Sequence, residues 1–322
     1  MPLKMYEGYI TDVKGIKVGH SQSEEGMTGC TAIICEKGAT GGVDVRGSAP
    51  GTRETDLFRP DKLVDKIHAV VLSGGSAFGL EAASGVMRYL EEQGTGFDVG
   101  VTKVPIVASA VIFDLGLGDH RIRPDVKMGY AAAKNAAFEE NRQGNIGCGM
   151  GATLGKIYGP AGAMKSGLGS ATVRAGELVV SAIVAVNSFG DVYDYETGIQ
   201  IAGVYDYEKK KMLNTYGIMQ AAGSSAGFNM SNTTIGVVAT NGILTKAEAN
   251  KVAELAHNGF ARSINPVHTM LDGDTIFAMA TNETAGDINL IGTMAAEAMS
   301  RAITNAVVSA GSCHGLYSYN DI

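Results

Sequence analysis

The sequence predicts a layered fold of the α/β or α+β class, in which helices cover sheets. Short apolar runs bounded by turn residues predict strands, and segments with apolar residues at three- and four-residue spacing predict helices. Glycine, at 44 of 322 residues, is about twice as frequent as the average of ~7%, and charged residues, at 18%, fall below the usual ~25%. This composition is typical of a chain rich in tight turns and buried strands.

Strands and helices alternate through the first half of the chain. The expected strands cover residues 31–35, 43–45, 67–72 and 104–113, and the expected helices cover residues 80–92 and 126–140. A glycine run, GNIGCGMGATLGKIYG, follows these elements. After it, SATVRA and LVVSAIVAVN predict a hairpin that turns at Gly176.

The composition at the start of the second half predicts a linker. Residues 205–230 carry KKKMLN and AAGSSAG and show no convincing periodicity, so we expect a flexible connection over residues 205–232. The pattern then becomes regular. A strand is expected at residues 233–240, and a helix is expected to begin at the capping box Thr245-Lys-Ala-Glu248. A second strand is expected at residues 275–280, and a last helix at about residues 287–309.

The composition argues against several classes of protein. The four cysteines lack the spacing of a disulfide framework or a zinc site, which fits a reducing cytoplasm. The longest apolar run, Leu178 to Val186, is too short to span a bilayer, and the opening MPLKMYEGYITDVKG lacks the apolar core of a secretory signal. A net charge of −7 with both signs interspersed argues against nucleic-acid binding. We expect a soluble, cytoplasmic protein that binds neither nucleic acid nor membrane.

Three motifs resemble known sites without matching them. The glycine run fails as a phosphate-binding loop because Met150 and Ile157 stand where a glycine and a hydroxyl are needed, so a tight loop is favoured over a site role for Lys156. The order of LSGGSAFG suggests a nucleophile elbow, but Phe78 replaces a required glycine, which leaves a serine hydrolase using Ser76 as a minor rival. The six histidines show no i, i+4 pair, and we expect no metal site.

The stretch SNTTIG places two threonines at the start of a predicted strand. A threonine hydroxyl needs a base, and a threonine at a chain's N-terminus can use its own amine. An internal threonine acquires that amine only when the preceding bond is cleaved, and a flexible segment before it would let the Thr233 oxygen attack the Asn232 carbonyl. An Asn-Thr turn that enters a strand is the alternative that these residues leave open.

Two carboxylates flank a glycine in Asp272-Gly273-Asp274, just before another predicted strand and near His268. Such a group can form a turn, bind a divalent ion or orient a nucleophile. No further ligands follow at the spacing of a calcium-binding loop, so a turn is the default interpretation.

Six ordered blocks together resemble one family. They are DVRGSAPGTRETD (44–56), LSGGSAFGLEAASGV (72–86), SAVIFDLGLGD (109–119), GCGMGATLGK (147–156), NTTIGVVATN (232–241) and PVHTMLDGDTIFAMAT (266–281). Their order is similar to that of the P1-family peptidases, which include L-aminopeptidase/D-esterases, β-peptidyl aminopeptidases and nylon-oligomer hydrolases. The resemblance covers nearly the whole chain.

The resemblance implies one catalytic domain that cleaves itself between Asn232 and Thr233. The products would be an α-like fragment of residues 1–232 and a β-like fragment of residues 233–322. Thr233 would be the nucleophile and its new amine the base, with no cofactor. The implied fold is α+β, a four-layer αββα sandwich like that of N-terminal nucleophile hydrolases, assembled as a homotetramer.

The resemblance also implies roles for further residues. Asn187 matches the residue whose amide supplies the oxyanion hole, and Lys156 matches a lysine near the nucleophile in the nylon-hydrolase branch. Asp272 and Asp274 match that branch's carboxylate pair. An acid at this pair helps to hold the substrate amine in the aminopeptidase branch, which makes Asp274 a candidate for substrate binding. Phe113 is a second candidate, although it lacks the phenol that several relatives carry there.

The predicted function is hydrolysis of amide bonds, with removal of N-terminal residues from small peptides, amino-acid amides or esters. Endo-type hydrolysis of 6-aminohexanoate (nylon) oligomers is the nearest alternative. Acyl transfer from Thr233, as in ornithine acetyltransferases, is an alternative of another class, and a non-catalytic binding protein is a third. A requirement for a free substrate amine separates the first two.

Overall fold

The main sheet has the hydrogen-bonded order β10-β11-β16-β18-β2-β4-β7-β3, and β1 also pairs with β2. The computed structural model describes residues 3, 5–223 and 232–322 of the chain. The strands of this sheet are β1 (Lys17–Ser23), β2 (Thr28–Val45), β3 (Thr52–Arg53), β4 (Lys66–Ser73), β7 (Val107–Val111), β10 (Leu168–Ala175), β11 (Leu178–Ala185), β16 (Ile235–Gly242) and β18 (Thr275–Thr284). The helices are α1 (Ala82–Glu92), α2 (Val126–Lys134), α3 (Thr215–Ala222), α4 (Lys246–Ser263) and α5 (Ile288–Val308).

Short strands pair outside the main sheet. They are β5 (Phe97–Asp98) with β6 (Lys103–Val104), β8 (Thr153–Leu154) with β9 (Met164–Lys165), β12 (Asp191–Tyr193) with β13 (Gln200–Ala202) and β17 (Ile264–Asn265), and β14 (Tyr205–Asp206) with β15 (Lys211–Met212).

The long strand β2 connects two halves of the main sheet. Its first part pairs with β1 and β4, and its last part pairs with β18. The register between β2 and β4 shifts between Ile34 and Ala39, where the strand passes from one half-sheet to the other. One continuous sheet is therefore folded into two layers.

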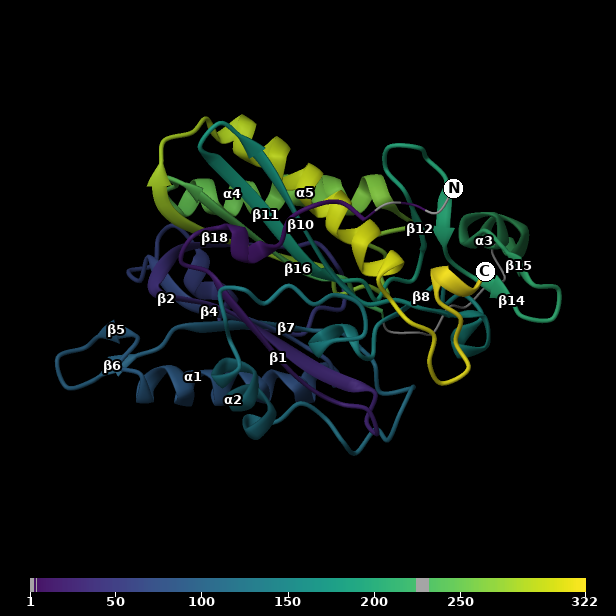
Figure 1. Cartoon of the computed structure of the whole chain (residues 1–322), viewed down its shortest axis with the longest axis horizontal. Coiled ribbons are helices and arrows are strands. Elements are labelled where there is room, and N and C mark those ends of the chain that lie inside the picture. The colour runs from purple at the N-terminus through teal and green to yellow at the C-terminus, as the bar shows by residue number, and fades with distance from the viewer. Residues whose placement is uncertain (1–2, 4, 224–231) are drawn as a thin grey trace.

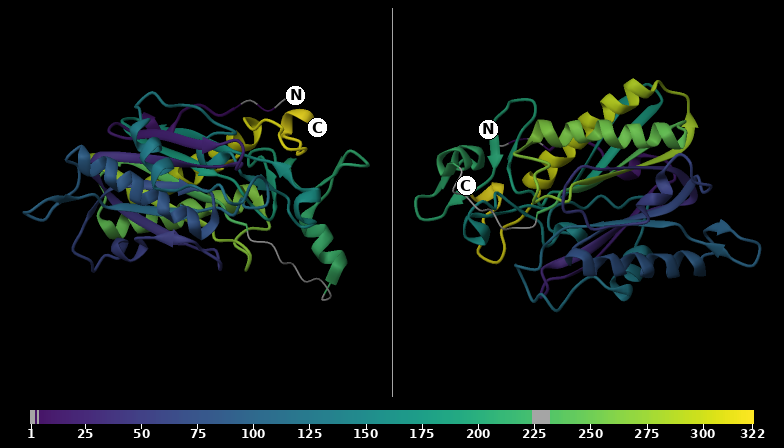
Figure 2. Two further views of the ribbon diagram at one scale, coloured as in Figure 1. Left: turned by 90° about the horizontal axis from the view of Figure 1, so that it is seen from below. Right: turned by 180° about the vertical axis from the view of Figure 1, so that it is seen from behind.

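Helices cover the outer face of each half-sheet. α4 and α5 pack on the half that contains β10, β11, β16 and β18, and α1 and α2 pack on the half that contains β1, β4 and β7 (Figures 1 and 2). Neighbouring strand residues point to opposite faces. Val237 of β16 and Val70 of β4 belong to the core between the half-sheets, whereas Val238 packs with α4 and α5, and Val71 packs with α1 and α2. The predicted α+β class with αββα layering is confirmed.

Several local predictions match the structure closely. The Thr245 hydroxyl accepts the Glu248 N–H and the Glu248 carboxylate accepts the Thr245 N–H, so the capping box begins α4 as expected. Gly176 has φ +58 in the turn between β10 and β11, a left-handed conformation that favours glycine. These features depend on short-range hydrogen bonds and backbone preferences, which a sequence carries directly.

Other elements differ from the prediction. The strands expected at 31–35 and 43–45 are parts of the one long β2. The strand expected at 104–113 is interrupted after Val104, because Pro105 has no N–H to donate to a neighbouring strand, and β7 ends at Val111. The helix expected at 126–140 ends at Lys134.

Part of the expected linker has secondary structure. Residues 205–222 contain β14, β15 and α3, whereas residues 224–231 lie outside the described residues. The buried Asp191 carboxylate anchors the start of α3, since it accepts the Thr215 N–H and the Thr215 hydroxyl, each at 2.6 Å. The sequence carried a local signal for this helix, the N-cap Asn214, whose side chain accepts the Gly217 N–H at 2.7 Å, but the lack of periodicity in the segment hid it.

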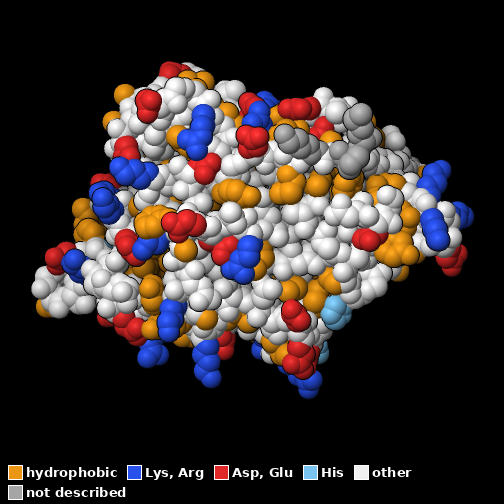
Figure 3. Space-filling view, viewed as in Figure 1, with side chains coloured by type: hydrophobic (Ala, Val, Ile, Leu, Met, Phe, Trp, Pro, Cys, Tyr) orange, Lys and Arg blue, Asp and Glu red, His pale blue; other side chains and the backbone are white. Residues whose placement is uncertain are grey.

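Lys, Arg, Asp and Glu side chains are interspersed on the face of the molecule shown in Figure 3. This pattern agrees with the charge distribution along the sequence. Within the described ranges, every helix is too short or too polar to cross a bilayer.

Phe277 tests the core between the half-sheets. It is fully buried, and its ring centroid lies 5.7 Å from that of Phe58. Phe277→Ala should lower the free energy of unfolding by about 3–5 kcal/mol, because it removes buried apolar surface and leaves a cavity. The measurement is a denaturant titration, with Leu63→Ala at an 86% exposed residue as the control. Equal losses for the two variants would contradict the assignment of Phe277 to the core.

Candidate active site

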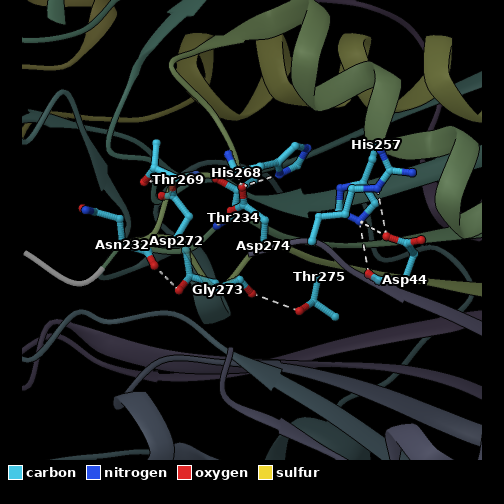
Figure 4. A network of polar contacts seen from close by, with 12 residues as sticks. Asp44, Asn232, Thr234, His257, His268, Thr269, Asp272, Gly273, Asp274 and Thr275 are labelled. Atoms are coloured by element: carbon cyan, nitrogen blue, oxygen red, sulfur yellow. Dashed lines mark hydrogen bonds and ion pairs between the residues drawn. The ribbon is translucent and has the colours of Figure 1, made fainter. Parts of the chain in front are cut away.

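The parallel strands β16 and β18 bring the motifs NTT and DGD side by side. The two strands pair from their first residues, and Asn232 and Asp272 form a parallel bridge just before them. The Thr234 N–H donates to Asp274 Oδ1 at 2.7 Å. Figure 4 shows these residues facing one another at the strand entrances. The pairing of the strands thus assembles the centre of the predicted site.

The peptide group between Asn232 and Thr233 is held on both sides. The Asn232 carbonyl oxygen accepts the Gly273 N–H at 3.2 Å, and the Thr233 hydroxyl donates to the same oxygen. The Thr233 N–H donates to the Asn187 carbonyl at 3.0 Å. The hydroxyl therefore lies against the carbonyl group that it would attack.

Asn187 and Lys156 form the second side of the site. Asn187 follows β11, which pairs with the start of β16, so it reaches Thr233. Lys156 Nζ donates to Asn187 Oδ1 at 2.6 Å and to the Asn187 carbonyl at 3.2 Å. The Asn187 amide nitrogen donates to the Phe113 carbonyl at 3.1 Å. The structure thus places the Phe113 backbone, rather than its ring, on Asn187.

A loop before β18 holds the two carboxylates. Asp272 Oδ2 accepts the Thr269 N–H at 2.9 Å and the Thr269 hydroxyl at 2.6 Å. Asp274 Oδ2 accepts the His268 N–H at 3.2 Å and contacts His268 Nδ1 at 2.8 Å. Both aspartates are at most 2% exposed. Buried carboxylates are stable only when they are hydrogen-bonded, and this loop supplies the donors.

Burial determines the electrostatics of the site. Lys156 is 4% exposed, and burial lowers its pKa to about 7, although the negative charges of Asp272 and Asp114 oppose the shift. Burial raises the pKa of Asp272, and the charge of Asp274 adds to this effect, while hydrogen bonds from Thr269 oppose it. A lysine with such a pKa is partly neutral near pH 7 and can accept a proton.

A pocket adjoins the predicted site residues. Its lining includes Phe113, Thr153, Lys156, Leu117 and Asp114. Burial raises the pKa of Asp114 to about 6, although hydrogen bonds from Thr28 and the Gly75 N–H oppose the shift. The pocket therefore offers apolar surface together with a carboxylate, close to the lysine.

The predicted residues Thr233, Asn187, Lys156, Asp272 and Asp274 thus lie in one connected network. Sequence reasoning noted His268 and Gly273 beside the acid pair but gave them no role, and it missed Thr269; the structure adds all three to this network. It also missed Asp114, which lines the adjoining pocket. The sequence did carry a signal for Gly273, because this glycine stands between two acids. A Cβ at this position would lie 2.9 Å from the Thr233 hydroxyl oxygen and 2.6 Å from the Ala49 carbonyl.

The serine-hydrolase rival gains no support. Ser76 begins a short 3₁₀ helix, Ser76–Glu81, before α1, and among the described residues no hydrogen bond joins it to a histidine. The described part of the chain also contains no group of three or more His, Cys, Asp or Glu side chains arranged to hold a metal ion.

Comparison with known proteins identifies the family. The model of peptidase family S58 matches residues 8–319. The chain belongs to peptidase family S58. This confirms the resemblance predicted from the six sequence blocks, and it makes the chain a peptide-bond hydrolase.

Relatives within peptidase family S58 carry two kinds of name. The chain is 39% identical to an uncharacterised aminopeptidase of Mycobacterium leprae, over 96% of this chain and 92% of the relative. It is 34% identical to a 6-aminohexanoate-oligomer endohydrolase of Kocuria sp., over 84% of this chain and 74% of the relative.

A solved structure shows the same fold. The L-aminopeptidase D-Ala-esterase/amidase of Ochrobactrum anthropi, described as a variant of the Ntn hydrolase fold, superposes with a TM-score of 0.71 at 18% identity, over 96% of this chain and 88% of that one.

The lowered pKa of Lys156 can be measured directly. With lysines labelled with ¹³C at Cε, the Lys156 signal, assigned by its loss in Lys156→Met, should titrate at about pH 7. Asp272→Asn should lower this pKa further, because it removes a negative charge that stabilises the ammonium.

Lys165 provides the matched control for this titration. It is fully buried, and burial lowers its pKa to about 8, with Cys313 and Asp114 as the opposing charges. Its titration should therefore not move in Asp272→Asn. A Lys156 signal that titrates above pH 10 would rule out a lysine that is partly neutral at pH 7.

Proposed function

We propose that the protein is a self-processing aminopeptidase whose nucleophile is Thr233. The observation that carries this proposal is the contact between the Thr233 hydroxyl and the carbonyl oxygen of Asn232, which belongs to the bond to be cleaved. The Gly273 N–H donates to the same oxygen at 3.2 Å. A donor in this place polarises the carbonyl and stabilises the negative charge that develops during attack.

Self-cleavage proceeds in two steps. The Thr233 oxygen attacks the Asn232 carbonyl carbon while its proton passes to a base, and the C–N bond then breaks as the Thr233 nitrogen gains a proton. This leaves an ester between Asn232 and the Thr233 oxygen. Water hydrolyses the ester, which yields a carboxylate on Asn232, a hydroxyl and a free amine on Thr233, and fragments of residues 1–232 and 233–322.

Lys156 is the proposed base for the first step. Its Nζ and the Thr233 N–H both donate to the Asn187 carbonyl oxygen, at 3.2 and 3.0 Å, so the two residues are neighbours. A pKa of about 7 leaves much of Lys156 neutral at physiological pH. After cleavage the new Thr233 amine takes over as base for substrate hydrolysis, since an α-amine has an unperturbed pKa of about 7.7–8.0.

Asn187 and Asp274 complete the proposed machinery. The Asn187 amide donates to the Phe113 carbonyl in the uncleaved chain, so the Gly273 N–H is the donor already in place on the scissile carbonyl. We assign Asn187 as a further oxyanion donor in the processed enzyme. Asp274 accepts the N–H of Thr234, the residue after Thr233, and its charge favours a protonated Thr233 amine.

The proposed substrates are peptides or amino-acid amides with a free N-terminal amine. The 39% identity to the uncharacterised aminopeptidase of M. leprae supports this choice. The Asp114 carboxylate in the adjoining pocket is a suitable partner for such an amine. The similarity to the endohydrolase of Kocuria sp. supports internal cleavage of 6-aminohexanoate oligomers as a second candidate.

Thr233→Ala should abolish self-cleavage, because the variant lacks the attacking oxygen. Denaturing mass spectrometry should find one species of 322 residues in this variant and two fragments joined at residues 232 and 233 in the wild type. Thr234→Val is the matched control, since the Thr234 hydroxyl is buried with no hydrogen-bond partner in the described part of the chain. This control should cleave normally. Cleavage in Thr233→Ala, or at another bond, would refute the mechanism.

A substrate comparison separates the two candidate activities. The processed protein should hydrolyse an aminoacyl p-nitroanilide at least about 100-fold faster than its N-acetylated form. Acetylation removes the positive charge of the substrate amine, which the buried Asp114 carboxylate is proposed to bind. The measurement is kcat/KM for both compounds. Equal values would eliminate the aminopeptidase and favour internal cleavage.

A further inference from the structure

His268 occupies a place that neither the sequence motifs nor the proposed reaction explains. Its Nδ1 lies 2.8 Å from Asp274 Oδ2, and its backbone N–H donates to the same oxygen at 3.2 Å. The other oxygen of Asp274 accepts the Thr234 N–H at 2.7 Å. A chain of hydrogen bonds thus runs from His268 through Asp274 to the residue that follows Thr233 (Figure 4).

The direction of the contact between His268 and Asp274 follows from chemistry. Both oxygens of Asp274 accept backbone N–H groups, from Thr234 and from His268 itself, so we assign Asp274 as the acceptor and His268 Nδ1 as the donor. The Asp274 side chain is 1% exposed, whereas that of His268 is 19% exposed. A donor that binds a buried carboxylate forms a strong, charge-assisted hydrogen bond.

Helix α4 fixes the orientation of the His268 ring. The ring lies edge-on to His257, with centroids 4.9 Å apart, and stacks against Phe260 at 6.0 Å. His257 is itself held by a contact of 3.1 Å between its Nε2 and the Asp44 carbonyl, and burial lowers its pKa to about 3. A neutral, buried ring therefore forms the wall behind His268.

The backbone of His268 is also unusual. Its φ of +55 lies in the left-handed region, which most residues with a side chain avoid. The next residue, Thr269, donates to Asp272 with both its N–H and its hydroxyl. His268 thus holds the Asp274 carboxylate, and the next residue, Thr269, holds the Asp272 carboxylate.

We propose that His268 is a positioning residue, which holds the Asp274 carboxylate against the Thr234 N–H and so fixes Thr233 for attack. This inference rests on the proposed function for its catalytic consequence. His268 does not touch the reacting atoms, and its effect is transmitted by Asp274.

Two substitutions separate the hydrogen bond from the backbone conformation. Glycine accepts φ above zero but provides no side-chain donor, whereas asparagine tolerates this conformation and carries an amide nitrogen near the position of Nδ1. His268→Gly should slow self-cleavage and lower kcat/KM by about 10- to 100-fold, the range expected for loss of a hydrogen bond to a charged group. His268→Asn should remain within about threefold of wild type. His120→Asn, at an exposed histidine, is the control.

A double-mutant cycle tests whether His268 acts through Asp274. In an Asp274→Asn background, His268→Gly should have almost no additional effect on self-cleavage or kcat/KM, because the carboxylate that it positions is gone. Equal effects of His268→Gly in both backgrounds would overturn the proposal. Failure of His268→Asn to restore activity would also overturn it.

Amide hydrogen exchange tests the positioning without any catalysis. In a Thr233→Ala background, His268→Gly should speed exchange of the Thr234 amide by at least about tenfold relative to the Val238 amide of β16, and His268→Asn should not. Unchanged Thr234 exchange would refute the positioning role. If exchange responds as expected but the wild type neither cleaves itself nor hydrolyses amides, the proposed function fails and the structural role of His268 stands.

Discussion

The parallel, in-register pairing of β16 and β18 is the constraint on which the whole site depends. It sets Thr234 against Asp274 and the Asn232 carbonyl against the Gly273 N–H. Side chains alternate between the faces of a strand, so a slip of one residue would turn the Thr233 hydroxyl to the opposite face. The core resists such a slip, because Gly236 faces α5, where a Cβ would lie 2.9 Å from the Met299 side chain, whereas its neighbour Ile235 packs between the half-sheets.

The same packing that encloses the candidate site also shifts the pKa values of its ionisable groups. Lys156, Asp272 and Asp274 are nearly inaccessible to water, and removing a charge from water is costly unless partners compensate. Here the compensation comes from opposite charges and from hydrogen bonds donated by the loop before β18. Burial still lowers the pKa of Lys156 to about 7, a value that suits proton transfer at neutral pH.

Local signals predicted some elements well and could not predict others. The capping box at Thr245 and the glycine turn at Gly176 depend on neighbouring residues, and both are present. By contrast, β2 is continuous because β4 and β18 pair with its two ends. The start of α3 is held both by its local N-cap, Asn214, and by the distant Asp191, which binds Thr215. The strands that pair with β2 and the Asp191 carboxylate are remote in sequence, so no short window of the sequence contains these contacts.

The sequence by itself determined the chemical inventory of this protein: a threonine after a stretch of small and polar residues, an acid pair around a glycine, and the order of motifs that marks the family. The tertiary structure alone decided how these groups meet. It placed the Gly273 N–H on the Asn232 carbonyl, turned the Asn187 amide toward Phe113 and brought His268 onto Asp274. The physical reason is that hydrogen bonds and desolvation depend on distances in space. Thr234 and Asp274 are 40 residues apart in the sequence, and the pairing of two strands brings them into contact.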